Sequence, residues 1–272
     1  MKPLRRAREA EVIAEFLRNE FYQQEFHHDR EKFQALVMNG DTSDERENAL
    51  RRALLFRRRG PMWRELPPDT QWWEVQLQPE DLPRISVFPR AHWRKIAGGS
   101  FRLPHVIERI RQHPLHRQRG CVDSDAEQTP RNLDEFVAKI RALNRKYAAS
   151  SSKGAIVLIG TSEREPALVF EGNHRLTASL LDSPGECPEG FRVFFGSSPS
   201  MVRCCWYQSR LTNLLRYTLD RILHLGYDRE ADVDRVLREL DRAYIPPATA
   251  IAREALAESL TAERKSAPTS SS

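Results

Sequence analysis

The sequence has no long hydrophobic run. Its longest apolar stretches are Ala155 to Ile159 and Ala167 to Phe170, far short of the ~20 residues that a membrane-spanning helix needs. We therefore expect no transmembrane segment and no membrane partner. Near the N-terminus, Glu9, Glu11 and Glu15 interrupt the apolar core that a secretory signal peptide requires, so no such leader is expected.

Cysteine is also scarce, with four residues in a chain of 272. The four lack the spacing of a metal site, and adjacent cysteines rarely form a disulfide; they are Cys121, Cys187, Cys204 and Cys205. The neighbouring His27 and His28 would point in different directions on a helix, which argues against a metal ion there. Neither the cysteines nor these histidines predict a metal site, and the sequence favours a reducing, cytoplasmic compartment.

An excess of one charge is absent too, since 43 Lys and Arg face 38 Asp and Glu, a net charge of +5. A DNA-binding surface needs a basic stripe on one face, so DNA is a possible but not a favoured partner. The run Arg57 to Arg59 lies in a region of nearly balanced charge. We interpret it as the cationic end of a helix, placed at the negative C-terminal pole.

Both ends of the chain have the apolar spacing of amphipathic helices. Residues 1–70 form an expected N-terminal helical extension, with helices at Pro3 to Phe26, Arg30 to Met38 and Ser43 to about Arg58. Residues 208–262 form an expected C-terminal helical region, with helices at Leu211 to Leu223, Arg229 to Leu240 (capped by Asp228) and Ala248 to Leu260. A disordered tail, 263–272, follows. We expect these extensions to wrap the core or to form a homodimer.

The central residues 71–207 mix strands and helices and are expected to form an α+β core. Alternating polarity around Val75 predicts a strand, and further strands are expected at Ile85 to Phe88 and Phe191 to Phe195. A hairpin is expected from Ala155 to Ile159 with Ala167 to Phe170. Helices are expected at Pro104 to Arg111, at Leu133 to Tyr147 (capped by Asn132) and at Leu176 to Leu181, with a loop at 112–130 and a connection at 150–154. Five tryptophans are expected to pack the extensions onto this core: Trp63, Trp72, Trp73, Trp93 and Trp206.

The most informative segment runs from Glu171 to Arg175, where a strand ends and a helix begins. The first amides of a helix lack intrahelical acceptors and favour an anion. Gly172 lets the backbone approach a phosphate. Arg175 can hold it in a bidentate fork, and His174 can donate a hydrogen bond. The structural alternative is a corner in which Arg175 pairs with a carboxylate and Gly172 holds a positive φ.

The segment from Val169 to Ala178 resembles the signature of the ParB/sulfiredoxin-like superfamily. That signature is a strand, an acidic or small residue, Gly, any residue, His or Arg, Arg, and then an apolar residue followed two places later by Ala; here it is Glu171-Gly172-Asn173-His174-Arg175-Leu176-Thr177-Ala178. The resemblance covers about residues 71–195. It implies a ParB/sulfiredoxin-like core, a small mixed sheet with helices, to which the helical extensions are added.

Members of this superfamily bind nucleoside triphosphates, CTP in chromosome-partition proteins and ATP in sulfiredoxins and free-serine kinases. Their Gly-x-His/Arg-Arg turn holds the phosphates. The resemblance therefore implies a nucleotide-binding role, with ATP or CTP and Mg²⁺, for Gly172, Asn173, His174 and Arg175, and for Thr177 just beyond them.

The sequence departs from each branch of the family. Asn173 stands where sulfiredoxins have their catalytic Cys, so sulfinic acid repair is not expected. Val106 follows Pro104-His105 where free-serine kinases have a glutamate, and no recognition helix of the partition-protein kind is apparent.

The leading interpretation is a phosphotransferase, an ATP-type kinase of a small-molecule acceptor, with Glu171 and His174 as catalytic residues. Weaker candidates for the base or the Mg²⁺ ligand are Glu74, Glu80 and Asp81, and the turn that holds Thr161 and Ser162 could line a nucleotide pocket. One alternative is a nucleotide-gated module that binds DNA or protein without covalent chemistry. Another is an interaction module that kept only the fold. We further expect phosphate affinity to change near neutral pH, as His174 charges.

Overall fold

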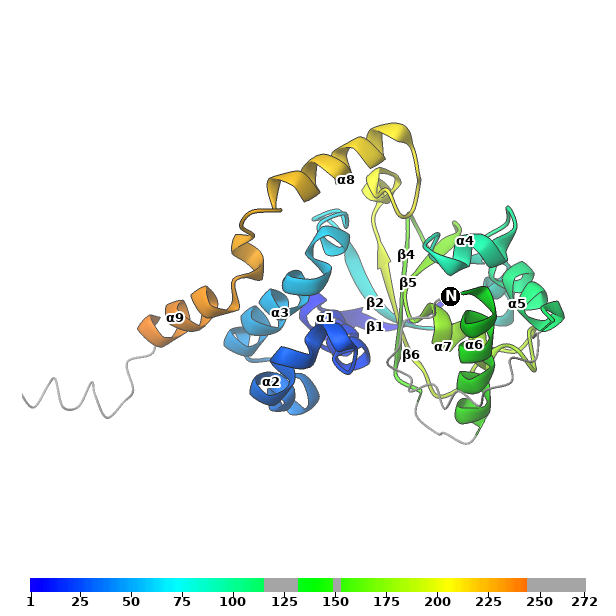
Figure 1. Cartoon of the computed structure of the whole chain (residues 1–272), viewed down its shortest axis with the longest axis horizontal. Coiled ribbons are helices and arrows are strands. Elements are labelled where there is room, and N and C mark those ends of the chain that lie inside the picture. The colour runs from blue at the N-terminus through cyan, green and yellow to red at the C-terminus, as the bar shows by residue number, and fades with distance from the viewer. Residues whose placement is uncertain (115–131, 149–152, 244–272) are drawn as a thin grey trace, which may run out of the picture.

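A six-stranded mixed sheet forms the centre of the protein (Figure 1). The computed structural model describes residues 1–114, 132–148 and 153–243. The strand order is β1-β2-β6-β4-β5-β3, where the strands are β1 Lys2–Ala7, β2 Gln71–Gln76, β3 Ile85–Ser86, β4 Ala155–Gly160, β5 Ala167–Glu171 and β6 Arg192–Ser197. β6 pairs antiparallel with β2 and parallel with β4, and β4 forms an antiparallel hairpin with β5. The predicted α+β class is confirmed.

Helices cover both faces of the sheet, and each layer has its own hydrophobic core. The first layer contains α1 Glu9–Glu20, α2 His27–Asn39, α3 Glu45–Trp63 and α9 Val233–Ala243. The second layer contains α4 His92–Ala97, α5 Leu103–Gln112, α6 Leu133–Ala148 and α7 Asn173–Ser179. Short 3₁₀ turns lie at Gln24–Phe26, Pro79–Arg84, Pro199–Arg203 and Arg229–Ala231. Within the described ranges, no helix combines the length and apolar character needed to cross a membrane.

α8, Leu211–Leu223, lies apart from both layers and crosses the top of the molecule in Figure 1. Its bounds confirm the sequence prediction. The expected packing role of the tryptophans is confirmed for α3, because Trp63 stacks on Trp72 of β2 with ring centroids 6.0 Å apart.

The predicted helix from Pro3 to Phe26 is wrong at its start. Lys2–Ala7 is a strand, β1, which pairs antiparallel with β2 at the edge of the sheet. Leu4, which the helical pattern placed on an apolar stripe, is exposed, and only Ala7 of this strand is buried. The open edge of β2 supplies backbone partners that a local helical pattern cannot reveal, so the sheet extends into the region assigned to a helical extension.

The interpretation of the arginine run as a helix end is also wrong, since α3 continues to Trp63. Instead, these cations join α3 to its neighbours. Arg57 pairs with Asp29 of α2 at 2.5 Å, and Arg59 pairs with Glu20 of α1 at 2.6 Å. The arginine run therefore has a structural role, which it fulfils through ion pairs within the first layer.

Most other elements match their predictions to within a few residues, and two of the differences concern helix starts. α7 begins at Asn173, earlier than expected, so His174 and Arg175 belong to its first turn. Asp228 caps the 3₁₀ turn before α9, not α9 itself. The helix α4 was not predicted. The expectations for Cys121, the helix from Ala248, the tail, most of the 112–130 loop and residues 150–152 lie outside the described residues.

Candidate functional site

The predicted turn lies where the β4–β5 hairpin leads into α7. Gly172 has φ +94°, the positive φ that the structural alternative expected. A Cβ at this position would lie 3.2 Å from Ile156 Cγ1 and 3.4 Å from the Ala155 carbonyl oxygen. Glycine is therefore required both by the backbone conformation and by the close approach to β4.

Arg175 reaches back from α7 to the end of β5. Its guanidinium donates to Glu171 Oε1 at 2.7 Å and to the Ala155 carbonyl oxygen at 3.1 Å. Its buried Nε finds no hydrogen-bond partner among the described residues. Both side chains retain a small exposed area, 15% for Arg175 and 16% for Glu171. The pairing with a carboxylate agrees with the structural alternative, and the Nε is a buried donor without a partner in the described chain.

Asn173 uses both ends of its amide within the fold. Its Oδ1 accepts from the Phe88 backbone N–H at 2.7 Å, and its Nδ2 donates to the Val169 carbonyl oxygen at 3.3 Å. Thr177 is fully buried, and its hydroxyl has no hydrogen-bond partner in the described chain. Asn173 thus fixes the turn against the segment after β3, and Thr177 lies away from solvent on the core side of α7.

His174 packs between aromatic rings. The centroid of its imidazole lies 5.2 Å from that of Trp93 and 5.4 Å from that of Phe136. Burial, reinforced by the charges of Lys139 and Arg175, lowers the pKa of His174 to about 3. The expectation that His174 gains charge near neutral pH is therefore wrong. A neutral imidazole can still donate one hydrogen bond, so its phosphate contact stays a prediction.

Charged residues from both helical layers surround Glu171. Glu20 of α1 pairs with Arg59 of α3 at 2.6 Å, and both interact electrostatically with Glu171. Burial and the nearby Glu20 raise the pKa of Glu171 to about 7, against the opposing effect of Arg175 and Arg59. Lys139 of α6 interacts with Glu20, and burial lowers its pKa.

We call this group of five residues the Glu171 cluster: Glu20, Arg59, Lys139, Glu171 and Arg175. With both carboxylates ionised it holds three cations and two anions, and protonation of Glu171 removes one of the two negative charges. Sequence reasoning missed three of its members, Glu20, Arg59 and Lys139. The arginine run was a visible signal, but no local spacing indicates that residue 59 lies near residue 171.

The weaker carboxylate candidates lie in ionic contacts elsewhere. Hydrogen bonding to Arg192 lowers the pKa of Glu74. Burial alone would raise the pKa of Asp81, but the Met1 amino group, the Gln78 amide and Arg84 together lower it. Both carboxylates therefore lack the basicity that a general base needs.

Three other residues proposed from the sequence for the nucleotide site are either exposed or distant from the turn at Gly172. Glu80 is exposed on the 3₁₀ turn after β2. Thr161 and Ser162 lie on the β4–β5 turn, at the opposite end of β5 from Glu171. There the Thr161 hydroxyl faces the Tyr207 hydroxyl at 3.5 Å. None of the three joins the Glu171 cluster.

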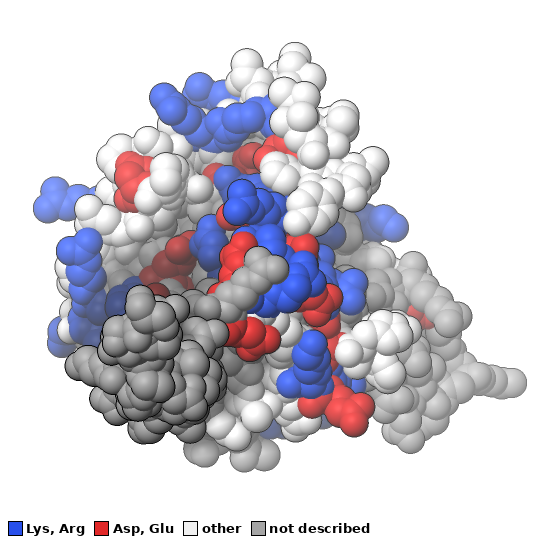
Figure 2. Space-filling view, turned by 90° about the vertical axis from the view of Figure 1, so that its left-hand side faces the viewer, with Lys and Arg blue, Asp and Glu red and all other residues white. Residues whose placement is uncertain are grey.

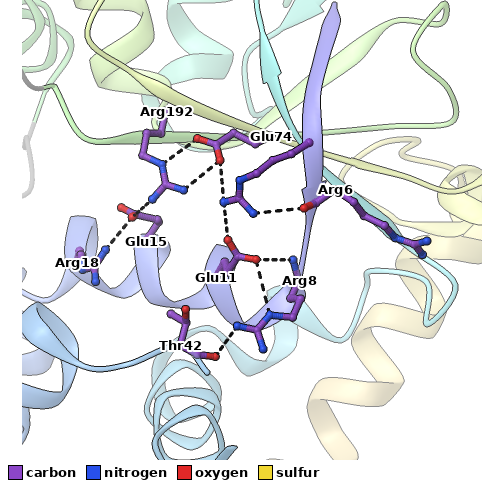
Figure 3. A network of polar contacts seen from close by, with 9 residues as sticks. Arg6, Arg8, Glu11, Glu15, Arg18, Thr42, Glu74 and Arg192 are labelled. Carbon is purple, nitrogen blue, oxygen red and sulfur yellow. Dashed lines mark hydrogen bonds and ion pairs between the residues drawn. The ribbon is translucent and has the colours of Figure 1, made fainter. Parts of the chain in front are cut away.

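A second polar cluster joins α1 to the sheet (Figure 3). It alternates in charge, with ion pairs between 2.5 and 2.9 Å linking Arg18, Glu15, Arg192, Glu74, Arg5 and Glu11 in that order. Arg8 extends it from Glu11 to the Thr42 carbonyl oxygen. A polar pocket of about 280 Å³ lies beside it. Because its members already pair with one another, this network serves to hold α1 on the sheet.

Basic and acidic side chains are interspersed on the molecular face shown in Figure 2. Lys and Arg gather near the centre of that view, with Asp and Glu among them, so this face carries no uninterrupted basic stripe. Over the part of the chain that the structure describes, no three His, Cys, Asp or Glu side chains are grouped to hold a metal ion.

The Glu171 cluster is thus the best candidate site, since it combines an unusual carboxyl group, several cations and a glycine turn. Comparisons with protein-family models, with curated proteins and with solved structures found nothing that matches this chain.

Proposed function

We propose that the chain is a ParB/sulfiredoxin-like nucleotide-binding phosphotransferase that acts on a small-molecule hydroxyl. In this proposal, the turn from Gly172 to Arg175 binds the phosphates of a nucleoside triphosphate, ATP or CTP. Arg175 contributes the principal contact, through a guanidinium whose Nε has no partner within the described chain. The cytoplasm is the proposed compartment, in keeping with the free thiols of Cys187, Cys204 and Cys205.

The observation that carries the proposal is the raised pKa of Glu171, about 7, beside Arg175. A general base works best when its pKa lies near the operating pH. Carboxyl groups with strongly shifted pKa values next to a cation are enriched at active sites. Glu171 is therefore the proposed base.

In the proposed step, the Glu171 carboxylate accepts the proton of the acceptor hydroxyl. A bond forms between that oxygen and the terminal phosphorus, while the bond from the phosphorus to the bridging oxygen breaks and a nucleoside diphosphate leaves. Arg175 offsets the negative charge on the transferred group. His174 is neutral in this scheme and its ring positions the start of α7 against Trp93.

Mg²⁺, which the family resemblance implies, does not fit a dedicated site in this cluster. The cluster has two carboxylates, Glu20 and Glu171, and the described residues group no three His, Cys, Asp or Glu side chains that could hold a metal ion. We therefore assign no step to a protein-bound Mg²⁺, which triphosphates ordinarily carry with them.

The test is calorimetric titration of the full chain with ATP, CTP and GTP in the presence of Mg²⁺. We expect micromolar binding of at least one triphosphate, and Arg175→Ala should weaken it at least about tenfold, because a charge-assisted hydrogen bond is lost. Arg235→Ala is a matched control, since Arg235 also forms an i,i+4 ion pair with a glutamate, on α9. Equal binding by wild type and Arg175→Ala, or no binding at all, would contradict the proposal.

Turnover is tested separately from binding. Glu171→Gln should retain nucleotide binding and abolish formation of the diphosphate, measured with water or a panel of small alcohols as the acceptor. If Glu171→Gln forms diphosphate as fast as wild type, Glu171 is not the base.

A second candidate, a nucleotide-gated binding module, is favoured by one contact. The Ala155 carbonyl oxygen that accepts from Arg175 also accepts from Asn19 of α1, so a phosphate that draws Arg175 away would alter a contact with the first layer. Nucleotide binding without diphosphate formation, together with altered hydrogen exchange in α1, would select this candidate over the phosphotransferase.

A further inference from the structure

The helix α8 presents its polar side to the protein. Asn213 is buried and its Nδ2 donates to the carbonyl oxygens of Val202 and Gln208, at 2.9 and 2.8 Å. Arg216 reaches the Arg203 carbonyl oxygen and lies 3.4 Å from Glu65. Asp220 lies 4.0 Å from Arg64 of α3. These contacts fix which side of the helix faces inward.

The apolar side of α8 consequently faces solvent. At 100° per residue, positions 213, 216 and 220 lie on one side of the helix, whereas Leu211, Leu215 and Ile222 lie on the opposite side, with Leu214 and Leu219 flanking them. The exposed fractions range from 40% to 82% for eight large side chains, Leu211, Leu214, Leu215, Leu219, Ile222, Leu223, Leu225 and Tyr227. An ordinary surface helix has the reverse polarity, with its apolar stripe against the core. We call this surface the α8 face.

We propose that the α8 face is a homodimer interface, covered by the same face of a second copy of the chain. Within α8, positions 211, 215, 218 and 222 recur at intervals of four, three and four, and all but Thr218 are Leu or Ile; Leu225 follows just beyond the end of the helix. This is the seam spacing by which two helices pack against each other. A two-fold axis across the seam brings Leu215 and Ile222 of both copies into the centre and leaves neither face open.

The size of the α8 face suits such a dimer. Its eight side chains expose roughly 500 Å² per protomer, if a fully exposed large apolar side chain presents about 100 Å². A standard interface buries about 800 Å² on each partner, and polar rim residues supply the rest. Exposed apolar patches of this extent mark interaction sites.

The charge distribution favours a protein partner over a lipid surface. Interfacial membrane helices hold Lys and Arg on a polar side that is free to reach lipid headgroups. On α8, Asn213 and Arg216 are bonded to backbone carbonyl oxygens, and the other cation of the helix, Arg221, lies 5.9 Å from the centre of the Tyr217 ring. The proposal is independent of the nucleotide site.

Sedimentation equilibrium of the full-length chain tests the proposal. We expect a dimer for wild type and a monomer for the double variant Leu215→Glu/Ile222→Glu. The dimer dissociation constant of the variant should be at least about a hundredfold higher, because two charges per copy would be buried in the seam. The control Gln34→Glu/Ser183→Glu adds the same charge at exposed positions elsewhere and should remain a dimer.

Circular dichroism and a thermal melt of the monomeric variant establish that it is folded, which is expected because both positions are solvent-exposed in a single chain. A wild-type chain that is monomeric at about 100 µM overturns the proposal. So does a double variant that dimerises as tightly as wild type, or a control that dissociates with it. Binding of a monomeric wild-type chain to anionic vesicles would instead assign the face to a lipid surface.

Discussion

Asn19 and Arg175 donate hydrogen bonds to the same acceptor, the carbonyl oxygen of Ala155, at 3.0 and 3.1 Å. Asn19 belongs to α1 in one helical layer, and Arg175 belongs to α7 in the other. The first residue of β4 therefore joins the two layers through a single carbonyl group. Any change at the turn from Gly172 to Arg175 that moves the Arg175 guanidinium also alters the hydrogen bonding of α1.

Substitutions of Asn19 test this junction. Asn19→Ala removes one hydrogen bond and should lower the free energy of unfolding by about 1 kcal/mol. Asn19→Asp should cost more, since a carboxylate would face the Ala155 carbonyl oxygen without a proton to donate. Urea unfolding of the three proteins measures the order. Equal stability of Asn19→Asp and wild type would show that the hydrogen bond contributes nothing.

Gly172→Ala should be strongly destabilising. The residue has φ +94°, and an added Cβ would meet Ile156 at 3.2 Å, so we expect a loss of about 2 kcal/mol or more. Gly185→Ala is the matched control, because its Cβ would meet no atom within 4 Å. The control should change stability little or increase it slightly. Thermal melts of the two variants decide the matter, and similar melting temperatures would contradict the strain at Gly172.

Glu171→Gln should change how stability depends on pH. The pKa of Glu171 is about 7 in the folded chain, above its ordinary 4.5, so the folded state binds the proton more tightly than the unfolded state. Stability from this group is complete below pH 4.5 and is lost as pH rises to 7. Relative to wild type, Glu171→Gln should therefore gain up to about 3 kcal/mol between pH 4.5 and 7. Parallel stability curves for the two proteins would indicate an ordinary pKa.

The contribution of His174 to stability changes with pH in the opposite direction. Its pKa in the folded chain, about 3, lies below its ordinary 6.5, so its contribution is present above pH 6.5 and is lost as pH falls toward 3. His174→Phe keeps a ring between Trp93 and Phe136 but cannot take up a proton. This variant should lose less stability than wild type on acidification through that range, as measured by chemical unfolding at a series of pH values. Identical acid sensitivity would mean that His174 titrates normally.

Two neighbouring arginines on α3 should differ in their importance. Arg51 is 1% exposed, and it donates to the Leu36 and Asp41 carbonyl oxygens and to Asn48. Arg51→Met leaves these buried acceptors without donors and should cost about 3 kcal/mol. Arg52, 39% exposed, forms surface ion pairs, so Arg52→Met should cost less than about 1 kcal/mol. Comparable losses for the two variants in urea unfolding would contradict this ranking.

Much of the fold was accessible from the sequence because its core elements have simple periodicity. The all-apolar run of β4, the stripe of α6 and the Asn132 cap each correspond to a local physical cause, and each is present; the Asn132 side chain accepts from the Glu135 amide at 2.9 Å. The prediction for Lys2–Ala7 was wrong because the strand with which this segment pairs, β2, lies far along the chain. Edge pairing is a non-local interaction, and neither residue type nor spacing encodes it.

The candidate site was only partly accessible for the same reason. Gly172 and Arg175 could be identified, since a strand, a glycine and a helix start are contiguous in the sequence. The protonation state of His174 could not be predicted, because its surroundings include Trp93 and Phe136 from two other helices. Likewise the raised pKa of Glu171 depends first on its burial and then on the nearby Glu20, and only the folded chain creates either.

The position of β6 in the sheet has a consequence for biosynthesis. Among the strands of the described residues, β6 is translated after the other five, yet it lies between β2 and β4 and joins the β1–β2 pair to the β4–β5–β3 group. Until Arg192–Ser197 has been translated, the nascent chain holds two incomplete sheets, each with an open hydrogen-bonding edge. Such edges are prone to pair with other chains. The completed sheet therefore cannot form before Arg192–Ser197 has been translated, and until then the open edges of β2 and β4 are the ones exposed to unwanted pairing.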